Sequence, residues 1–369
     1  MRRRGRGLFQ RDRARCLLSA RQRCCRLRRG ARCIGADRLQ RPGRGRAGRR
    51  SVWYRLAVRQ RARELRLSGV GRHCACTQVN RMKATCLVDA RNTLGEGCVW
   101  DPRDDSLCWT DIEESRIYRL SSRQEVTSYA LPERAGFILP RKEAGFIVGL
   151  ASRIARVDAA FSRFETVTEV EPALAQTRVN DAAIDPFGGI VFGTFDERDR
   201  QPVASLYRLS PEGDLRQLLR DITISNGIAF SPDGEIMYFA DTPVGVIRRF
   251  KVGAAFASLE ELAPLADANV APGSPDGAIV DCEGGYWSAR VWGGCVVRIS
   301  ADGEVTDRVE LPTKGPTCVA LGGPDGKRLF ITTLRVRHTQ EELDLSPTAG
   351  GLFVADVAVP AQAPRLASV

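Results

Sequence analysis

One sequence pattern recurs six times between Met82 and Val369, and this repeat constrains the fold more than any other feature of the chain. Each copy has a short apolar strand, a polar turn with Asp, Pro or Gly, a second apolar or aromatic strand, and a third strand ending in a basic and an apolar residue. The first copy is GCVWDPRDDSLCWTDIEESRIYRL at 97–120, and the fourth is NGIAFSPDGEIMYFADTPVGVIRRF at 226–250. Such self-similarity indicates one supersecondary unit used repeatedly.

The spacing of the copies identifies the architecture. The apolar residue before each turn defines six anchor positions at intervals of roughly 40 to 50 residues, as in propeller blades: Val99, Ile138, Ala183, Ala229, Ile279 and Ala320. The period-2 alternation excludes helical solenoids, and a β-sandwich would show shorter spacings without a superperiod. We therefore predict an all-β fold over 82–369, a six-bladed β-propeller in which the fourth strand of each blade is the least visible in the sequence.

The formal charge of +12 divides sharply between two segments. Residues 1–81 contain 26 Arg, no Lys and three acids, which gives +23, whereas 82–369 carry 30 basic and 41 acidic side chains, which gives −11. The basic segment has no apolar run long enough for a membrane span or a secretory signal. We predict that 1–81 is a disordered Arg-rich extension.

Three origins of this extension stay open. It could be translated GC-rich DNA upstream of a true start codon at Met82, a polyanion-binding arm, or a mitochondrial presequence, which its few serines disfavour. The acidic 82–369 segment gives no reason to expect a nucleic-acid partner.

Four polar residues occupy equivalent places in the repeat: Glu96, Asn180, Asn226 and Asp276 each stand three residues before an anchor position. Taken singly, each has an ordinary explanation as a turn residue. In a propeller, however, equal phase means equal height in the central channel, so loops ahead of the innermost strands would bring these side chains together at one end. Asp233, which follows its strand in a similar SPDG string, fails this test.

The residue types in this set indicate a hard oxygen site. Two carboxylates and two amide oxygens, without imidazole or thiolate, suit Ca²⁺, Mg²⁺ or Mn²⁺. Zn²⁺ would more usually recruit His, and His338, which we expect at the surface, is the single His after Met82. With that one histidine, a Ser-His-Asp relay has no plausible general base.

Five strings in this order resemble the SMP-30/gluconolactonase family of regucalcin-like lactonases over essentially all of 82–369: LGEGCVWD, RVNDAAIDPFGG, SNGIAFSPDG, SPDGAIVDCEGGYWSARVWGG and PTCVALGGPDG. The resemblance implies a six-bladed propeller with one divalent metal in its channel and hydrolysis of sugar lactones to aldonic acids. It assigns the metal to Glu96, Asn226 and Asp276, and substrate contacts to Arg178 and Asn180. Glu197 is a further candidate for substrate contact, although Arg198 beside it departs from the family pattern.

The sequence thus predicts a metal-dependent hydrolase of a sugar lactone in pentose or hexose catabolism. One ion (Ca²⁺, Mg²⁺, Mn²⁺ or Zn²⁺) would polarise the lactone carbonyl, and Asp276 would act as general base. L-Arabinono-, D-glucono- and D-xylonolactone are the leading substrates. The alternative is a non-catalytic propeller that binds metal or sugar. Cysteines in apolar strands imply a reducing, cytoplasmic location without a membrane partner, and the oligomeric state is left open.

Overall fold

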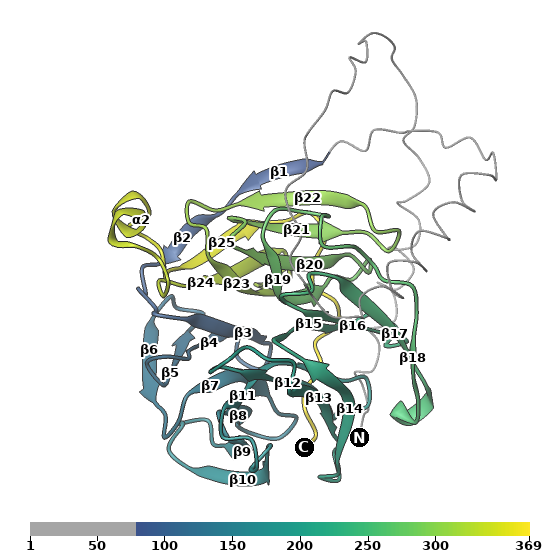
Figure 1. Cartoon of the computed structure of the whole chain (residues 1–369). Coiled ribbons are helices and arrows are strands. Elements are labelled where there is room, and N and C mark those ends of the chain that lie inside the picture. Colours follow the sequence, from purple (N-terminus) through teal and green to yellow (C-terminus); the bar gives the residue numbers. More distant parts are fainter. Residues whose placement is uncertain (1–78) are drawn as a thin grey trace, which may run out of the picture. The chain divides into compact units, whose positions relative to one another are not determined.

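The six repeats form six blades around a central channel (Figure 1). The computed structural model describes residues 79–369, in which five blades have four strands and one has a fifth strand. The predicted six-bladed propeller is therefore confirmed. The expectation for the extension falls almost entirely outside the described residues; strand β1 (Asn80–Lys83) overlaps its last two positions. Within 79–369, no helix is long and apolar enough to cross a membrane.

Each blade is an antiparallel sheet whose strands follow the chain outward from the channel. Blade 1 comprises β3 (Gly95–Asp101), β4 (Ser106–Asp111), β5 (Arg116–Leu120) and β6 (Val126–Ala130). Blade 2 comprises β7 (Ala135–Pro140), β8 (Phe146–Leu150), β9 (Arg153–Val157) and β10 (Phe164–Glu169). Blade 3 comprises β11 (Thr177–Ile184), β12 (Ile190–Asp196), β13 (Ala204–Leu209) and β14 (Leu215–Ile222). Blade 4 comprises β15 (Ser225–Phe230), β16 (Ile236–Asp241), β17 (Ile247–Val252) and β18 (Leu259–Glu261). Blade 5 comprises β19 (Ser274–Val280), β20 (Tyr286–Val291), β21 (Cys295–Ile299) and β22 (Val305–Glu310).

Blade 6 closes the ring with strands from both ends of the described chain. Its inner strands are β23 (Pro316–Gly322), β24 (Arg328–Thr333) and β25 (Leu352–Asp356), and β2 (Thr85–Val88) pairs antiparallel with β25 as the outermost strand. Strand β1 pairs parallel with β22 and widens blade 5. Because the ladder joins the first strands to the last, the ring cannot open without breaking hydrogen bonds between distant parts of the sequence.

Burial falls at the outer edge of the blades. Every residue of the second strands β4, β8, β12 and β20 is buried, whereas the outer strands β6 and β14 are mostly exposed. An outer strand needs few apolar residues, because it packs with one edge of the sheet in solvent. This explains why the fourth strands were the least visible in the sequence.

Aspartates fix the turns that follow the inner strands. Asp185 Oδ1 accepts the backbone N–H groups of Phe187 (2.7 Å) and Gly189 (3.0 Å), and its Oδ2 accepts from Arg208 Nε (2.6 Å). Asp281 repeats this arrangement in blade 5, with Arg298 as its ion-pair partner. These acids are therefore structural turn residues.

The two ends of the channel differ. We call the end where the inner strands begin the mouth end, and the opposite end the tail end. Across the tail end runs the C-terminal segment 358–369, the thin yellow tube that leads to the C-terminus in Figure 1. The segment hydrogen-bonds five of the six blades, through the backbones of Pro140, Gly188, Phe230, Cys282 and Gly326. Helix α2 (Gln340–Leu345) and the 3₁₀ turn η2 (Ala254–Phe256) are the helical elements of the described chain.

Candidate active site at the mouth end

The four residues of equal phase lie within the inner strands, near their first residues, and not in the loops ahead of them as predicted. Glu96 belongs to β3, Asn180 to β11, Asn226 to β15 and Asp276 to β19. The pairing register of each strand shifts at or beside this position, which marks a β-bulge. A bulge re-aims the side chains around it, so the strands themselves can present these residues to the channel.

Two predicted carboxylates and a third acid influence one another's protonation. Burial, and then the charge of Asp181, raises the pKa of Glu96 to about 8. Burial raises the pKa of Asp276 well above its ordinary value, with the charges of Glu96 and Asp181 as further causes. Burial also raises the pKa of Asp181 to about 7. We call Glu96, Asp181 and Asp276 the acid cluster; three carboxylates this close cannot all ionise easily without a compensating cation.

Asp181 was missed by the sequence reasoning, although the repeat contains a signal for it. The position after the residue of equal phase is glycine in four blades: Gly97, Gly136, Gly227 and Gly277. Blade 3 has Asp181 there instead. Its Oδ2 accepts the backbone N–H of Ile228 (3.0 Å), which ties blade 3 to blade 4 beside Asn226.

An amide pair joins the acid cluster to the predicted substrate contacts. Asn180 Nδ2 donates to Asn226 Oδ1 (3.1 Å) and to the Ser225 carbonyl (2.9 Å). Asn226 Nδ2 donates to Thr242 Oγ1 (2.8 Å), which in turn donates to the Pro275 carbonyl next to Asp276. These bonds fix the Asn226 amide with its nitrogen toward Thr242 and its oxygen toward Asn180.

Arg178 is buried and held from three directions. Its Nη1 donates to Asn180 Oδ1 (2.6 Å) and to the Val179 carbonyl (3.0 Å), and its Nε donates to Glu197 Oε1 (2.9 Å). Its guanidinium carbon lies 5.0 Å from the centre of the Phe195 ring. Among the described residues, Nη2 is left without a hydrogen-bond partner and is therefore the donor available to a ligand.

Glu197 is engaged by a second arginine that the sequence reasoning did not identify. Arg134, from the loop before β7, donates from Nη1 to Glu197 Oε1 (2.7 Å) and from Nη2 to Oε2 (2.6 Å). Such bidentate pairs are strong and directional. Glu197 thus holds Arg178 and Arg134 in place, and its oxygens are occupied in this structure.

A second layer of aspartates positions the start of two inner strands. Asp111, at the end of β4, accepts the N–H groups of Thr93 (2.8 Å) and Leu94 (3.0 Å), just ahead of Glu96. Asp241, at the end of β16, accepts those of Thr223 (3.1 Å) and Ile224 (2.9 Å), just ahead of Asn226. Both loops are therefore anchored before the chain reaches the site.

His338 is partly buried instead of lying at the surface as predicted. Its ring packs against Trp292 with centroids 5.4 Å apart, and both ring nitrogens are buried without a hydrogen-bond partner among residues 79–369. No serine or carboxylate of this region bonds to it, so the described residues contain no Ser-His-Asp relay around it.

The donor set fits a divalent cation. Within the described chain, no three His, Cys, Asp or Glu side chains form a ready chelating group. The predicted set Glu96, Asn226 and Asp276 needs an amide oxygen as its third ligand. The charge of Arg178 acts on Glu96 and Asp276, and this single guanidinium cannot balance the three acids of the cluster when all are ionised. Oxygen ligands with excess negative charge are what Ca²⁺, Mg²⁺ and Mn²⁺ prefer.

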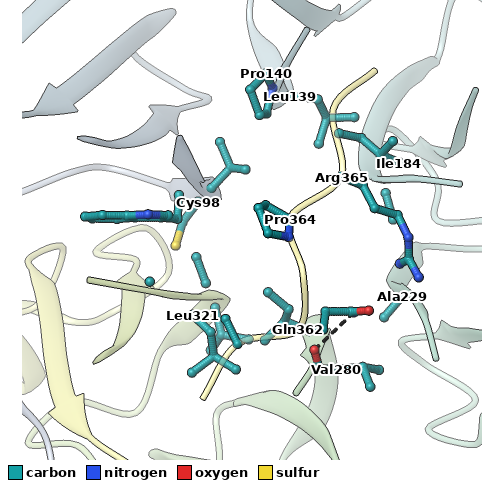
Figure 2. Close-up of a pocket in the computed structure, with 18 of the residues that line it drawn as sticks. Cys98, Leu139, Pro140, Ile184, Ala229, Val280, Leu321, Gln362, Pro364 and Arg365 are labelled. Carbon is teal, nitrogen blue, oxygen red and sulfur yellow. Dashed lines mark hydrogen bonds between the residues drawn. The ribbon is translucent and has the colours of Figure 1, made fainter. Parts of the chain in front are cut away.

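A cavity of about 500 Å³ lies toward the tail end of the channel. Five of the six anchor positions line it, and the C-terminal segment forms its floor. Figure 2 shows Pro364 near its middle, with Leu139 and Leu321 on opposite sides. Asp181 reaches this cavity, whereas the other site residues do not line it. Its apolar wall does not suit polar chemistry, so we place the candidate active site at the mouth end.

Comparison with known proteins supports the resemblance found in the sequence. The family described as SMP-30/Gluconolactonase/LRE-like region matches residues 94–335. An L-arabinolactonase of Azospirillum brasilense is 42% identical over 74% of this chain and 91% of its own length. A 6-deoxy-6-sulfogluconolactonase of Pseudomonas putida is 38% identical over 74% of this chain and 95% of its own. Among solved structures, a calcium-binding protein, regucalcin, of Agrobacterium tumefaciens matches with a TM-score of 0.73 and 29% identity over 78% of this chain and 98% of its own.

Proposed function

This chain belongs to the SMP-30/gluconolactonase/LRE-like family, and from that premise we propose that it hydrolyses a sugar lactone to the corresponding aldonic acid. The observation that carries the proposal is the acid cluster at the mouth end, joined through the Asn180–Asn226 amide pair to a buried arginine with a free donor. The relatives named as arabinolactonase and sulfogluconolactonase support it.

Glu96, Asn226 and Asp276 would hold one divalent metal ion, and the calcium-binding regucalcin neighbour supports this assignment. A bound cation would supply Lewis-acid stabilisation of the negative charge that develops on the lactone carbonyl oxygen. Ca²⁺, Mg²⁺, Mn²⁺ and Zn²⁺ remain candidates. A cation here also explains why the fold tolerates three close carboxylates, since it compensates their mutual repulsion.

The residues of the chain perform the remaining steps. Asp276 accepts a proton from the attacking water as the water oxygen bonds to the carbonyl carbon. The ring C–O bond then breaks, and the departing ring oxygen takes up the proton that Asp276 accepted, which regenerates the Asp276 carboxylate and leaves an open-chain aldonic acid. Arg178 Nη2 and the Asn180 amide orient the sugar, and Glu197 with Arg134 keeps Arg178 in position.

A non-catalytic metal-binding or sugar-binding propeller is the competing function. Holding a metal requires Glu96, Asn226 and Asp276 only. The Arg134–Glu197–Arg178 network does not contact these three directly, and a pure metal scaffold has no use for it. This network therefore favours catalysis on a bound sugar. The place in pentose or hexose catabolism and the cytoplasmic location stay predictions.

Acid release by the purified full chain tests the proposal. L-Arabinono-, D-glucono- and D-xylonolactone would be followed by pH-stat titration before EDTA treatment, after it, and after addition of Ca²⁺, Mg²⁺, Mn²⁺ or Zn²⁺. We expect turnover of at least one lactone, loss with EDTA and recovery with metal. Binding of a sugar acid without turnover of any lactone would favour the competing function.

A further inference from the structure

We propose that Arg200 and Arg337 form an anion subsite over the mouth, which selects lactones carrying a negative charge at the end of the sugar remote from the lactone carbonyl. This inference rests on the proposed function and concerns its substrate class. Neither Arg200 nor Arg337 belongs to the candidate active site.

Arg200 lies next to the site through a shared aromatic ring. Its guanidinium carbon is 5.6 Å from the centre of the Phe195 ring, and that of Arg178 is 5.0 Å from the same centre. Contacts therefore lead outward from Asn226 through Asn180 and Arg178 to Phe195 and then Arg200. A sugar with its carbonyl at the acid cluster would extend along this row, with its remote end near Arg200.

The turn that carries Arg200 is held rigidly. Asp196, buried at the end of β12, accepts the backbone N–H groups of Arg198 (3.1 Å), Asp199 (3.3 Å) and Gln201 (2.8 Å). Arg200 has a left-handed backbone with φ of 50°. Its exposed side chain thus projects from a preformed loop, which reduces the entropy lost when a ligand binds.

Arg337 comes from the opposite side of the ring. It lies in the long loop between β24 and β25 of blade 6, whereas Arg200 lies in the loop between β12 and β13 of blade 3. Both loops are at the mouth end. The backbone N–H groups of Arg335 and Val336 both donate to the Thr93 carbonyl at 3.0 Å, which holds the loop of Arg337 at the start of blade 1. The positive charge of Arg337 also acts on Arg200, whose pKa is lowered by burial and then by this charge. Loops from blades 3 and 6 therefore present like charges at the mouth end.

Neither charge is neutralised by the protein. Within residues 79–369, Arg200 and Arg337 form no ion pair and no side-chain hydrogen bond, and the contact of Arg200 with Phe195 is its one specific interaction. The neighbouring carboxylate of Glu197 is taken by Arg134 and Arg178. In a region whose formal charge is −11, this concentrates positive potential where a substrate enters.

The required ligand chemistry is a small anion on a sugar, such as a sulfonate, phosphate or carboxylate. Guanidinium groups bind these oxyanions by directional, charge-assisted hydrogen bonds. The anion must be separated from the lactone by the sugar chain, because the acid cluster would repel a charge placed next to it. The mouth would therefore attract one end of the substrate and the deeper site would bind the other.

The test measures kcat/KM for gluconolactone, its 6-phosphate, its 6-sulfonate and the corresponding 6-carboxylate lactone. Three full-length proteins are compared: the wild type, the double variant Arg200→Gln/Arg337→Gln and the control Arg123→Gln. Arg123 is exposed and lies in the tail-end turn between β5 and β6 of blade 1, away from the mouth. We expect kcat/KM of the wild type to be at least about 10-fold higher for a charged lactone, and this preference to shrink as salt rises. The double variant should lose about 10- to 100-fold more on that lactone than on gluconolactone, mostly through KM.

Equal kcat/KM for neutral and charged lactones in the wild type, or equal losses on both in the double variant, would overturn the subsite. The three anions distinguish which headgroup it takes. Binding of gluconate and 6-phosphogluconate, measured by calorimetry, separates this inference from the proposed function. If no lactone is hydrolysed but 6-phosphogluconate binds more tightly than gluconate and loses this advantage in the double variant, the subsite stands and the lactonase proposal fails. If the two acids bind alike, the subsite fails.

Discussion

The two ends of the channel are built from the same six inner strands and yet serve opposite purposes. At the mouth end, four of these strands carry Glu96, Asn180 with Asp181, Asn226 and Asp276, and burial raises the pKa of each of the three acids. At the tail end, the anchor positions are small or aliphatic, and the C-terminal segment bonds to five blades. The candidate site at one end is thus separated from the hydrogen-bonded closure of the channel at the other.

This difference shows where the fold accepts unfavourable electrostatics. Close buried carboxylates destabilise a protein unless a ligand compensates them, and such violations concentrate at functional sites. Nothing comparable occurs at the tail end, where the buried acids Asp185 and Asp281 are each paired with an arginine. The comparison predicts that substitutions at the mouth end change chemistry, whereas substitutions at the tail end change stability.

Replacing Asp276 should give the largest effect. Asp276→Asn removes the candidate base and a metal ligand, so kcat on the best lactone should fall by about 10²- to 10⁴-fold. The melting temperature of the metal-free protein should not fall, because the substitution relieves repulsion with Glu96 and Asp181. Asp233→Asn, in a tail-end turn, is the matched control and should retain full kcat. Unchanged activity in Asp276→Asn would contradict the assignment.

Metal binding should stabilise the mouth end measurably. At a Mn²⁺ concentration 100 times Kd, an ion that binds only the folded state adds about 2.7 kcal/mol to the free energy of unfolding. The melting temperature of EDTA-treated protein should therefore rise by several degrees, and Glu96→Gln should lose most of this rise. Glu165→Gln, an exposed acid on β10, should keep it. An equal rise in Glu96→Gln and wild type would place the ion elsewhere.

Arg134→Gln should have a smaller effect, confined to substrate binding. Without its bidentate partner, Glu197 holds Arg178 less firmly, so KM should rise about tenfold, which is about 1.4 kcal/mol, with a lesser change in kcat. Arg134→Lys should recover part of this loss. Arg156→Gln removes an exposed ion pair with Glu165 and serves as the control. A fall in kcat at constant KM would show that Arg134 acts on the reaction itself.

At the tail end, Gln362→Ala should lower stability and spare catalysis. Gln362 Nε2 donates to the carbonyls of Phe230 and Val280, both at 3.1 Å, and Figure 2 shows the bond to Val280. Its loss should reduce the free energy of unfolding by about 1 kcal/mol, measured by denaturant titration. The value of kcat/KM should stay within about twofold of the wild type. A large loss of activity would show that the two ends of the channel are coupled.

The sequence predicted those parts of the site that repeat. Equal phase identified Glu96, Asn180, Asn226 and Asp276, because the propeller converts a constant spacing into a common height. It also predicted six blades, because the strand pattern is local. The position of these residues within bulged strands could not be predicted, since a bulge depends on pairing with the neighbouring strand.

Other parts of the molecule were out of reach for a physical reason. The Arg134–Glu197 pair joins residues 63 positions apart, and Arg337 reaches the mouth from a loop outside the repeat. The C-terminal segment follows the last repeat and has no strand pattern, so its role as the floor of the channel depends entirely on tertiary contacts. Such features follow from how distant segments meet, which local pattern and phase do not encode.

The central claim is that Glu96, Asn226 and Asp276 together hold one metal ion at the mouth end. Anomalous diffraction from crystals of the protein grown with Mn²⁺ tests this most directly. The account predicts one strong peak within about 2.0–2.6 Å of a Glu96 carboxylate oxygen, Asn226 Oδ1 and an Asp276 carboxylate oxygen. A peak at other residues, or none at saturating Mn²⁺, would contradict it.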